Sequence, residues 1–243
     1  MATQIKPVGR AGPARLEEVS AARKRIVVVG ASGHARVILD ICHLQGMYEV
    51  IGLLDSYKPL GITCSGHSVI GSCRDLRALV AAEEIWGGIV AIGDNWVRSR
   101  IVAEMREAVP DFRFVNAIHP SAQVAEEVTL GPGTVVMAGA VINPGSEVGE
   151  FCIVNTRASL DHECIMEDYS SLGPAAVVGG CARIGAHSAI GIGAVVLQEI
   201  RIGSHSVVGA GATVVRHIPE AVVAYGTPAR VIRPRKPGDS YLK

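Results

Sequence analysis

The segment VNTRASLDHECIMEDYSSLGPAAVV, residues 154–178, decides the fold, because an aliphatic residue or methionine occupies every sixth position in it. The same period continues without a break from Ile118 to Val214. An α-helix repeats near 3.6 residues and a β-strand near 2, so neither produces a period of six. A parallel β-helix does, because each hexad forms one short strand followed by one bend.

A small side chain stands four positions after most of these aliphatic residues. We expect the aliphatic residue of each hexad to point into a narrow interior, and the small residue to fit near the corner. Three hexads then form one turn of a triangular coil, about 18 residues long. The small positions are Ala122, Thr134, Ala140, Ser146, Cys152, Ala158, Cys164, Ser170, Ala176, Ala182, Ser188, Ala194, Ser206 and Ala212, with Val128 and Ile200 as exceptions.

Composition agrees with a solenoid and argues against several classes of protein. Hydrophobic residues make up 49% of the chain and aromatic residues only 4%, and the 28 glycines suit tight corners. The formal net charge of zero gives no sign of a nucleic-acid-binding surface. The chain has no apolar run of about 18 residues and no signal-peptide pattern, so we expect no membrane partner.

The cysteines predict a reducing compartment. They form neither a CxxC pair nor a zinc-binding spacing, and two of them fill small-residue positions of the hexads. We therefore interpret them as reduced, buried, small apolar groups, and expect the protein to be cytoplasmic and to carry no metal ion. They are Cys42, Cys64, Cys73, Cys152, Cys164 and Cys181.

The chain before the hexads alternates predicted strands and helices. Residues 1–24 predict a flexible extension, in which Arg15–Lys24 could form a short helix. This alternation predicts a Rossmann-like α/β domain over residues 25–112, then the parallel β-helix over 113–217 and a capping loop with a basic tail over 218–243. Strands are predicted at Arg25–Gly30, Tyr48–Asp55 and Gly88–Gly93, and helices from Ala31 to Leu44, at Asp75–Ala82 and at Trp96–Val109.

The turn Gly30-Ala-Ser-Gly33 predicts an anion site, because it places backbone N–H groups at a helix N-terminus. Asp55 ends the second strand, where a ribose or base contact is expected, and Gly93-Asp94-Asn95 follows another strand at the same edge. An NAD-binding domain is an alternative, but the motif is GxxGxA rather than GxGxxG. The domain is also about half a dinucleotide fold, which suits one nucleotide diphosphate.

Several features, in chain order, resemble the NeuD/PglD-type sugar acyltransferases over residues 25–233. These bacterial enzymes join an N-terminal nucleotide-sugar domain to a left-handed β-helix. The resemblance implies a homotrimer that binds acetyl-CoA and acetylates the amino group of a UDP- or GDP-linked 4-amino-4-deoxy sugar in surface-glycan biosynthesis. The matching segments are Gly30-Ala-Ser-Gly-His-Ala35, Ala91-Ile-Gly-Asp-Asn95, the hexads, Asp161-His-Glu163 and Gly226-Thr-Pro-Ala-Arg230.

The resemblance also implies roles for single residues. It places the catalytic histidine at His162, the neighbouring acid at Glu163 and a nearby asparagine at Asn155. Some members of the family carry a second histidine nine residues later, where this chain has Ser171, so Ser171 or a backbone N–H could hold the thioester oxygen. The implied substrate-binding residues are Gly30, Ser32, Gly33, His34, Asp55, Gly93, Asp94 and Asn95, and those for acetyl-CoA are Ser171, Ile192, Ala210, Gly226 and Arg230.

Chemistry independently favours His162 as a general base. An amine must lose a proton as it attacks a thioester, and histidine accepts protons near neutral pH. An adjacent acid such as Glu163 can fix the tautomer and stabilise the imidazolium. A Gly-x-Pro turn followed by Arg230 is a compact loop with a cation, suited to the 3′-phosphate of CoA.

Three other functions stay open at this point. A sugar O-acetyltransferase of the sialic-acid type needs a base as well, and a non-catalytic solenoid could merely sense a nucleotide sugar. His187 and His205 lie 18 residues apart and should stack, so a metal site of the γ-carbonic-anhydrase kind is the third. A carbonic-anhydrase function would not explain the predicted N-terminal nucleotide-binding domain.

Overall fold

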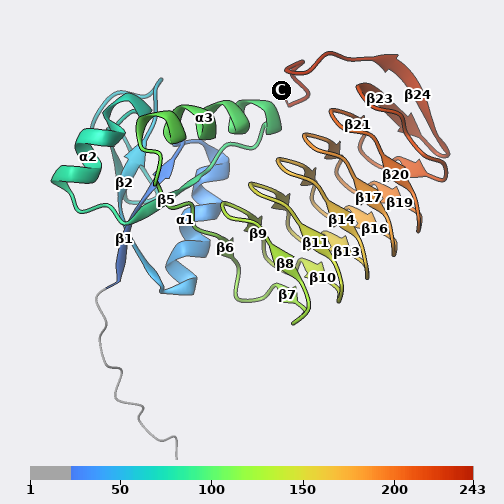
Figure 1. Ribbon diagram of the computed structural model, residues 1–243, viewed down its shortest axis with the longest axis horizontal. Coiled ribbons are helices and arrows are strands. Elements are labelled where there is room, and N and C mark those ends of the chain that lie inside the picture. Colours follow the sequence, from blue (N-terminus) through green and yellow to red (C-terminus); the bar gives the residue numbers. More distant parts are fainter. Residues whose placement is uncertain (1–22, 243) are drawn as a thin grey trace, which may run out of the picture.

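The computed structural model describes residues 23–242, which form an α/β part and a triangular coil joined along one side (Figure 1). The predicted extension and nearly all of the predicted helix Arg15–Lys24 lie outside the described residues. Lys24 itself begins a strand rather than ending a helix.

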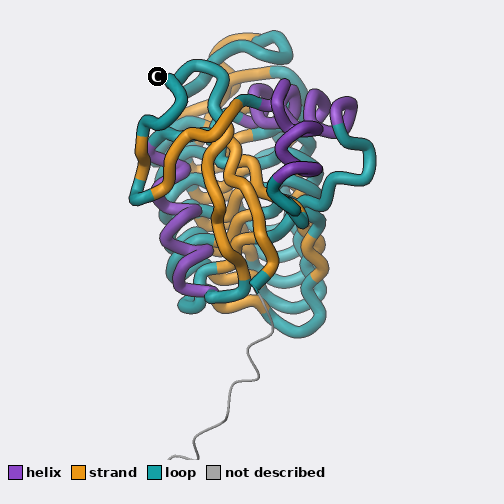
Figure 2. The backbone as a smooth tube through the Cα atoms, turned by 90° about the vertical axis from the view of Figure 1, so that its left-hand side faces the viewer, coloured by secondary structure: helices purple, strands orange, loops and turns teal. Residues whose placement is uncertain are grey.

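The α/β part contains a five-stranded sheet in the order β3-β4-β2-β1-β5, with β3 antiparallel to β4 and the other pairs parallel. Figure 2 shows helices on both sides of these strands. The elements are β1 Lys24–Val29, α1 Gly33–Gln45, β2 Tyr48–Leu54, β3 Thr63–Cys64, β4 His67–Gly71, a 3₁₀ turn Cys73–Asp75, α2 Leu76–Ala82, β5 Gly87–Val90 and α3 Asn95–Ala108.

The apolar run of β1 forms a strand that is buried on both faces. Ile26 and Val28 belong to the core that includes α1, whereas Val27 and Val29 belong to the core that includes α2 and α3. Alternate residues of a strand point to opposite sides, so a continuous apolar run satisfies both layers of helices. The predicted strand and helix types in this part are confirmed.

Two local predictions were incomplete or wrong. The predicted strand Gly88–Gly93 ends at Val90, and the following residues form the loop into α3. The β3–β4 hairpin was missed, although its turn carries a Ser-Gly signal. Ser65 and Gly66 have φ of 47° and 82°, the positive values that a two-residue hairpin turn of type I′ requires.

The coil consists of two-residue strands on three faces. Each strand residue pairs in parallel with the residue 18 positions later, as Ile142 does with Leu160. We call the faces face 1 (β7, β10, β13, β16, β19, β22), face 2 (β8, β11, β14, β17, β20) and face 3 (β6, β9, β12, β15, β18, β21). Corner 1–2, corner 2–3 and corner 3–1 are the turns that join them along the chain.

The strand bounds follow the predicted hexads. They are β6 Ala117–Ile118, β7 Gln123–Val124, β8 Thr129–Leu130, β9 Val135–Val136, β10 Val141–Ile142, β11 Glu147–Val148, β12 Ile153–Val154, β13 Ser159–Leu160, β14 Ile165–Met166, β15 Ser171–Leu172, β16 Val177–Val178, β17 Arg183–Ile184, β18 Ala189–Ile190, β19 Val195–Val196, β20 Arg201–Ile202, β21 Val207–Val208 and β22 Thr213–Val214. The second residue of each strand is the aliphatic position of its hexad.

The interior of the coil confirms the predicted pattern. From Val136 onward the aliphatic positions are buried, and only Ile118, Val124 and Leu130, in the first coil, are partly buried. From Thr134 onward the small positions are buried at the corners, and their hydroxyls donate to backbone carbonyls, as Ser146 does to Asp161 at 2.6 Å. The coil therefore has a narrow apolar interior, and the hydroxyls at these small positions have hydrogen-bond partners.

The last coil carries a hairpin, β23 Val222–Gly226 and β24 Ala229–Pro234, that extends face 3. β23 pairs in parallel with β21 through Val207 and Val223. The tail then returns towards α3, and Figure 1 shows the C-terminus close to the N-terminal end of that helix. The hydroxyl of Tyr241 accepts from the backbone N–H of Asn95 at 3.1 Å.

The α/β part lies on face 3 and along corner 2–3. Outward residues of face 3, such as Val135 and Ile153, share a core with α1. Along corner 2–3 the rings of Phe151, Tyr169, His187 and His205 stack on successive coils, with centroids 5.2, 5.0 and 4.7 Å apart. Met137, which follows β9 at corner 3–1, belongs to the core that includes α1.

Arg98 of α3 holds this contact together from a fully buried position. Its guanidinium donates to the carbonyls of Phe151, Tyr169, Ile92 and Gly93 and to the Asn95 amide oxygen, at 2.6 to 3.0 Å. Each nitrogen therefore has a partner, although no carboxylate faces the charge among these contacts.

Candidate active site

The turn before α1, Gly30–Gly33, has the geometry that the predicted anion site requires. Gly30 has φ of 109°, and a Cβ there would lie 2.9 Å from the Ala91 carbonyl oxygen, so only glycine fits. The N-cap residue Ser32 makes no side-chain cap, and the first turn of α1 carries no acid. A Cβ on Gly33 would meet nothing within 4 Å. The N–H groups at this helix start thus remain available to an anion.

The start of α3 is closed by contrast. Asp94 accepts from the N–H groups of Trp96 and Val97, both at 3.0 Å, and Tyr241 accepts from that of Asn95. Asn95 is buried, and its amide donates to Ser171 at 3.1 Å and to the Ser188 carbonyl at 3.0 Å. Asp94 thus caps α3 and Asn95 joins the two parts of the chain, while their role in substrate binding stays a prediction. Gly93 precedes them and gives its carbonyl to Arg98.

Asp55 lies beside the anion turn, as predicted, but its oxygens already have partners. It accepts from the backbone N–H of Ala31 at 3.0 Å and from those of Tyr57 and Lys58 at 2.9 and 3.0 Å. The same loop brings the Lys58 ammonium to the Ala31 carbonyl. Lys58 thus adds a positive charge to the turn. Sequence reasoning missed it, although it follows the acid at the end of the second strand by only three positions.

His34 lies half-buried in the first turn of α1. Its Nε2 is buried without a hydrogen-bond partner among residues 23–242. Burial, and then the Arg98 guanidinium, lower the pKa of His34 to about 4. The ring is therefore neutral at pH 7, and its unpaired nitrogen can still accept or donate one hydrogen bond.

His162 and Glu163 form an exposed pair at corner 1–2. The His162 Nδ1 lies 3.0 Å from the Glu163 Oε2, while the ring Nε2 makes no hydrogen bond with the described residues. Asp161 accepts from the His162 backbone N–H at 2.8 Å and from Asn143 at 2.9 Å, and these bonds lower the pKa of the Asp161 carboxyl. The pair therefore has the arrangement of a base and its orienting acid.

Gly180, one coil further along the chain, leaves open the space that the His162 ring occupies. A Cβ on Gly180 would lie 2.6 Å from the His162 Nε2 and 2.7 Å from its Cε1. The imidazole thus rests against a backbone that only glycine leaves free. Sequence reasoning did not single out Gly180, although it follows His162 by the 18 positions of one coil.

Most of the residues predicted to bind acetyl-CoA lie at corner 3–1, together with Asn155, the third predicted catalytic residue, whereas Ser171 lies on face 3. Asn155, Ile192 and Ala210 lie at corner 3–1, and the Gly226 turn lies on the same corner, where Thr227 contacts the Gly211 carbonyl at 3.4 Å. Ile192 and Ala210 are exposed. Within one chain, face 1 separates this corner from His162, because corner 1–2 is at the other edge of that face.

Ser171 lies at neither corner. It stands on face 3 beneath the α/β part, where its hydroxyl accepts from the buried Asn95 amide. The hydroxyl thus takes part in joining the two parts of the chain, and its role at the thioester stays a prediction.

The stacked histidines do not form the alternative metal site. His187 and His205 are nearly parallel, at 7°, and Trp96 packs against both rings. Nitrogen lone pairs lie in the plane of an imidazole ring, so stacked rings cannot direct them at one ion. Burial, and then His205 and Arg98, lower the pKa of His187 to about 4. The histidines serve as a packing surface for α3.

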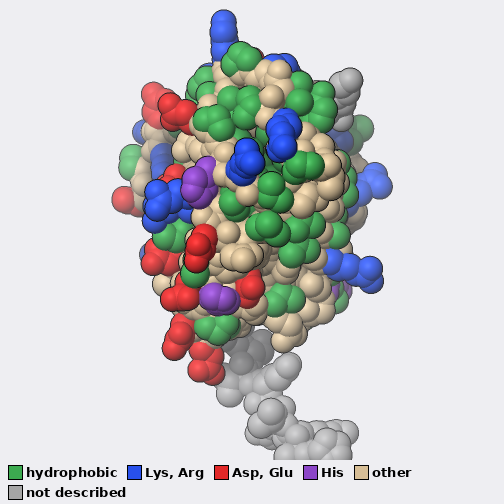
Figure 3. Space-filling model, turned by 90° about the vertical axis from the view of Figure 1, so that its right-hand side faces the viewer, with side chains coloured by type: hydrophobic (Ala, Val, Ile, Leu, Met, Phe, Trp, Pro, Cys, Tyr) green, Lys and Arg blue, Asp and Glu red, His purple; other side chains and the backbone are tan. Residues whose placement is uncertain are grey.

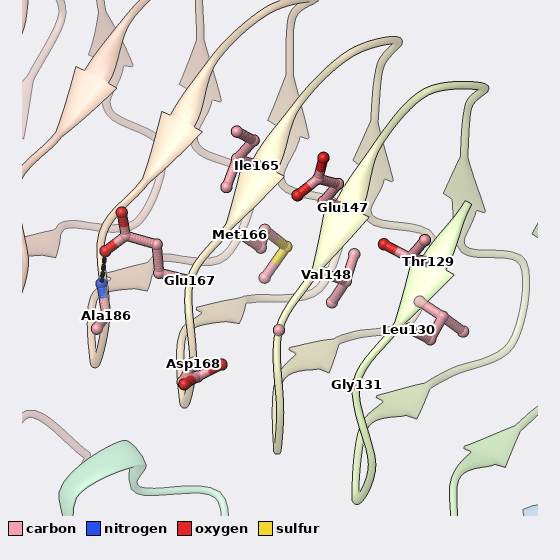
Figure 4. A pocket seen from close by; sticks show the side chains of 11 residues that line it. Thr129, Leu130, Gly131, Glu147, Val148, Ile165, Met166, Glu167, Asp168 and Ala186 are labelled. Carbon is pink, nitrogen blue, oxygen red and sulfur yellow. Dashed lines mark hydrogen bonds between the residues drawn. The ribbon is translucent and has the colours of Figure 1, made fainter. Parts of the chain in front are cut away.

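Two further surface features complete the description. An open hollow of about 580 Å³ lies over face 2, lined by Glu147, Ile165, Glu167 and neighbouring residues, and holds none of the predicted site residues (Figure 4). The C-terminal end of the coil shows apolar and basic side chains together (Figure 3). Exposed Tyr225, Val231 and Arg230 belong to the hairpin there. Among the described residues, no helix is long and apolar enough to cross a membrane.

Comparisons with known sequences relate this chain to a described family and to a curated enzyme. The family description "PglD N-terminal domain" matches residues 25–105. The UDP-N-acetylbacillosamine N-acetyltransferase of Bacillus subtilis (strain 168) is 34% identical over 118 residues, which are 47% of this chain and 52% of that protein. The chain thus spans about half the length of the curated relative it matches.

Solved structures match over more of the chain. A GDP-perosamine N-acetyltransferase variant from Caulobacter crescentus, in complex with CoA and GDP-perosamine, is 36% identical with a TM-score of 0.81, over 86% of this chain and 96% of that one. The acetyltransferase domain of PglB from Neisseria gonorrhoeae FA1090, in complex with acetyl coenzyme A, is 35% identical with a TM-score of 0.80, over 86% and 100%. The likeness therefore includes the α/β part and the coil together.

Proposed function

This chain belongs to the NeuD/PglD-type nucleotide-sugar acetyltransferase family, and we propose that it transfers an acetyl group from acetyl-CoA to the amino group of a UDP- or GDP-linked 4-amino-4-deoxy sugar. The product serves bacterial surface-glycan biosynthesis. The observation that carries this proposal is the exposed His162–Glu163 pair, with Nδ1 at 3.0 Å from the carboxylate and Nε2 left without a partner.

In this reaction His162 acts as the general base. The sugar amine attacks the thioester carbonyl carbon, the amine proton passes to the His162 Nε2, and the C–S bond breaks as the amide forms. Glu163 accepts from Nδ1–H and stabilises the imidazolium that results. The imidazolium then returns the proton to the CoA thiolate, so the enzyme ends in its starting state.

The nucleotide diphosphate binds at the Gly30–Gly33 turn. The open helix start, the space beside Gly33 and the nearby Lys58 support this assignment. His34 stands in the first turn of the same helix, at the sugar end of the proposed binding site. Asp55 shapes the loop through its three backbone contacts rather than acting as a free ribose ligand.

The active site lies between chains of a homotrimer. His162 stands at corner 1–2, whereas Asn155, Ile192, Ala210 and the Gly226 turn stand at corner 3–1 of the same chain. A site that uses both sets needs corner 1–2 of one chain beside corner 3–1 of another. Val177 on face 1 and Leu197 at corner 1–2 are exposed apolar residues available for such a contact. Light scattering should then give about three times the 25.4 kDa chain mass.

Acetyl-CoA runs along corner 3–1 towards the hairpin, where Arg230 is exposed beside the Gly226 turn. The cytoplasmic location expected from the sequence is supported by the state of the six cysteines, all of which are free thiols.

A transfer assay tests the proposal and its two rivals. The protein is incubated with acetyl-CoA and a panel of nucleotide-linked amino sugars and hydroxyl analogues, and acetylated product is measured by mass spectrometry. Amine acetylation is expected; acetylation of hydroxyls alone would favour the O-acetyltransferase, and binding without turnover would favour the scaffold. His162→Ala should lower kcat by about 10²–10⁴-fold with a modest change in KM, and near-normal turnover would overturn the assignment.

A further inference from the structure

A third potential ligand atom stands beside the His162–Glu163 pair. The thiol of Cys181 lies 3.7 Å from the Glu163 Oε2, and the ligand atoms of all three residues lie within 4.8 Å of one another. Sequence analysis treated the cysteines as buried small residues. Cys181 contradicts that reading, because it is exposed whereas the other five are buried.

The coil itself brings these atoms together. Glu163 and Cys181 occupy the same turn position on successive coils, and both have left-handed backbone, with φ of 55° and 58°. The Cys181 N–H donates to the His162 carbonyl at 2.9 Å, which fixes the two turns against each other. The positions of the ligand atoms thus follow from the register of the coil, and only short side chains have to adjust.

Their spacing and chemistry match a soft divalent cation. A tetrahedral zinc ion, with bonds of about 2.0–2.1 Å to N and O and about 2.3 Å to S, separates its ligand atoms by roughly 3.3–3.6 Å. The separations of 3.0 Å from Nδ1 to Oε2 and 3.7 Å from Sγ to Oε2 bracket that range. Imidazole, carboxylate and thiolate together favour zinc over magnesium or calcium.

The surroundings of Cys181 also favour a cation. The Glu163 carboxylate lies 3.7 Å from the Cys181 thiol, and Glu199 lines the same hollow. The same negative charges attract a positive ion, which can displace the thiol proton. An open hollow of about 630 Å³, lined by Cys181, Glu199, His217 and neighbouring residues, gives an ion access from solvent.

We propose that His162, Glu163 and Cys181 form a zinc-binding site, and that zinc bound there inhibits the enzyme. A metal on Nδ1 forces the remaining ring proton onto Nε2, so Nε2 loses the lone pair that a general base needs. Glu163 is drawn to the ion at the same time and no longer orients the imidazole. The inhibitory part rests on the proposed role of His162, whereas the binding part does not.

Cobalt(II) tests binding independently of catalysis. The reduced, metal-free protein is titrated with Co²⁺, and a thiolate-to-cobalt charge-transfer band in the near ultraviolet should appear. Because the other five cysteines are buried, the band reports Cys181. It should vanish in Cys181→Ser and persist in His217→Gln, which changes a neighbour in the hollow outside the cluster. No band in the wild type, or loss of the band only in His217→Gln, would overturn the site.

Zinc inhibition is measured on acetylated product rather than on released thiol, because the CoA thiol also binds zinc. Cys181→Ser should keep its metal-free activity, and the zinc concentration for half-inhibition should rise at least about tenfold. EDTA should restore the wild type. Equal zinc sensitivity of the two proteins would overturn the inhibitory role. A cobalt band with full activity in saturating zinc would keep the metal site but refute His162 as the base.

Discussion

Replacement of Arg98 by alanine should separate the α/β part from the coil. The fully buried guanidinium donates five hydrogen bonds, and its removal leaves four carbonyls and the Asn95 amide oxygen without that donor. Each orphaned acceptor costs about 1 kcal/mol at the low end. Water entering the cavity recovers part of this, so we expect a loss of about 3–5 kcal/mol in the free energy of unfolding.

Arg106→Ala is the matched control on the same helix. Its guanidinium pairs with Glu150 at 2.7 Å, but the two side chains are 45% and 38% exposed, so the expected loss is about 1 kcal/mol or less. Arg98→Lys keeps the charge but has fewer and differently directed donors, so its loss in the free energy of unfolding should lie between those of Arg98→Ala and Arg106→Ala.

Urea unfolding followed by tryptophan fluorescence measures these differences. Trp96 packs against His187 and His205 at the contact, so its emission should change when α3 leaves the coil. Hydrogen exchange should show faster exchange in α3 of Arg98→Ala while the coil stays protected. If Arg98→Ala and Arg106→Ala lose the same stability, the buried hydrogen bonds do not hold the parts together and the reasoning is refuted.

Three further predictions test the site and its surroundings. Gly180→Ala places a Cβ 2.6 Å from the His162 Nε2, so kcat should fall by about 10²-fold while the melting temperature changes little; unaltered kcat would show that the ring position is unimportant. Gly33→Leu fills a place where a Cβ meets nothing within 4 Å, so the fold should survive while calorimetry shows weaker binding of the sugar nucleotide and unchanged binding of acetyl-CoA. Stability should fall as the pH drops from about 6.5 towards about 4, because His34 and His187 have a pKa of about 4 when folded and the unfolded chain binds more protons in that window. His205 and Arg98 lower the pKa of His187, whereas Asp168 raises it. His187→Phe keeps the ring stack but removes this titrating group, so stability measured by urea unfolding should depend less on pH. An unchanged pH dependence would contradict the assignment.

The sequence by itself determined the coil. Its period of six is set by neighbours along the chain: each aliphatic residue needs an interior, and each small residue needs a corner, in every turn alike. For the same reason the open turn at Gly30–Gly33 and the exposed pair His162–Glu163 could be located from sequence, because each lies within one short segment. The β3–β4 hairpin also had a local signal in Ser65-Gly66, which went unrecognised.

Only the tertiary structure decided which polar residues remain free. Asp94, Asn95 and Ser171 have the residue types of ligands. Asp94 caps its own helix, whereas Asn95 donates to Ser171, 76 residues later, across the contact between the α/β part and the coil. The same holds for Cys181, which resembles the buried cysteines in sequence and reaches Glu163 because one coil follows another. Hydrogen-bond satisfaction is a property of contacts between distant segments, so a residue's availability for chemistry cannot be read from its own segment.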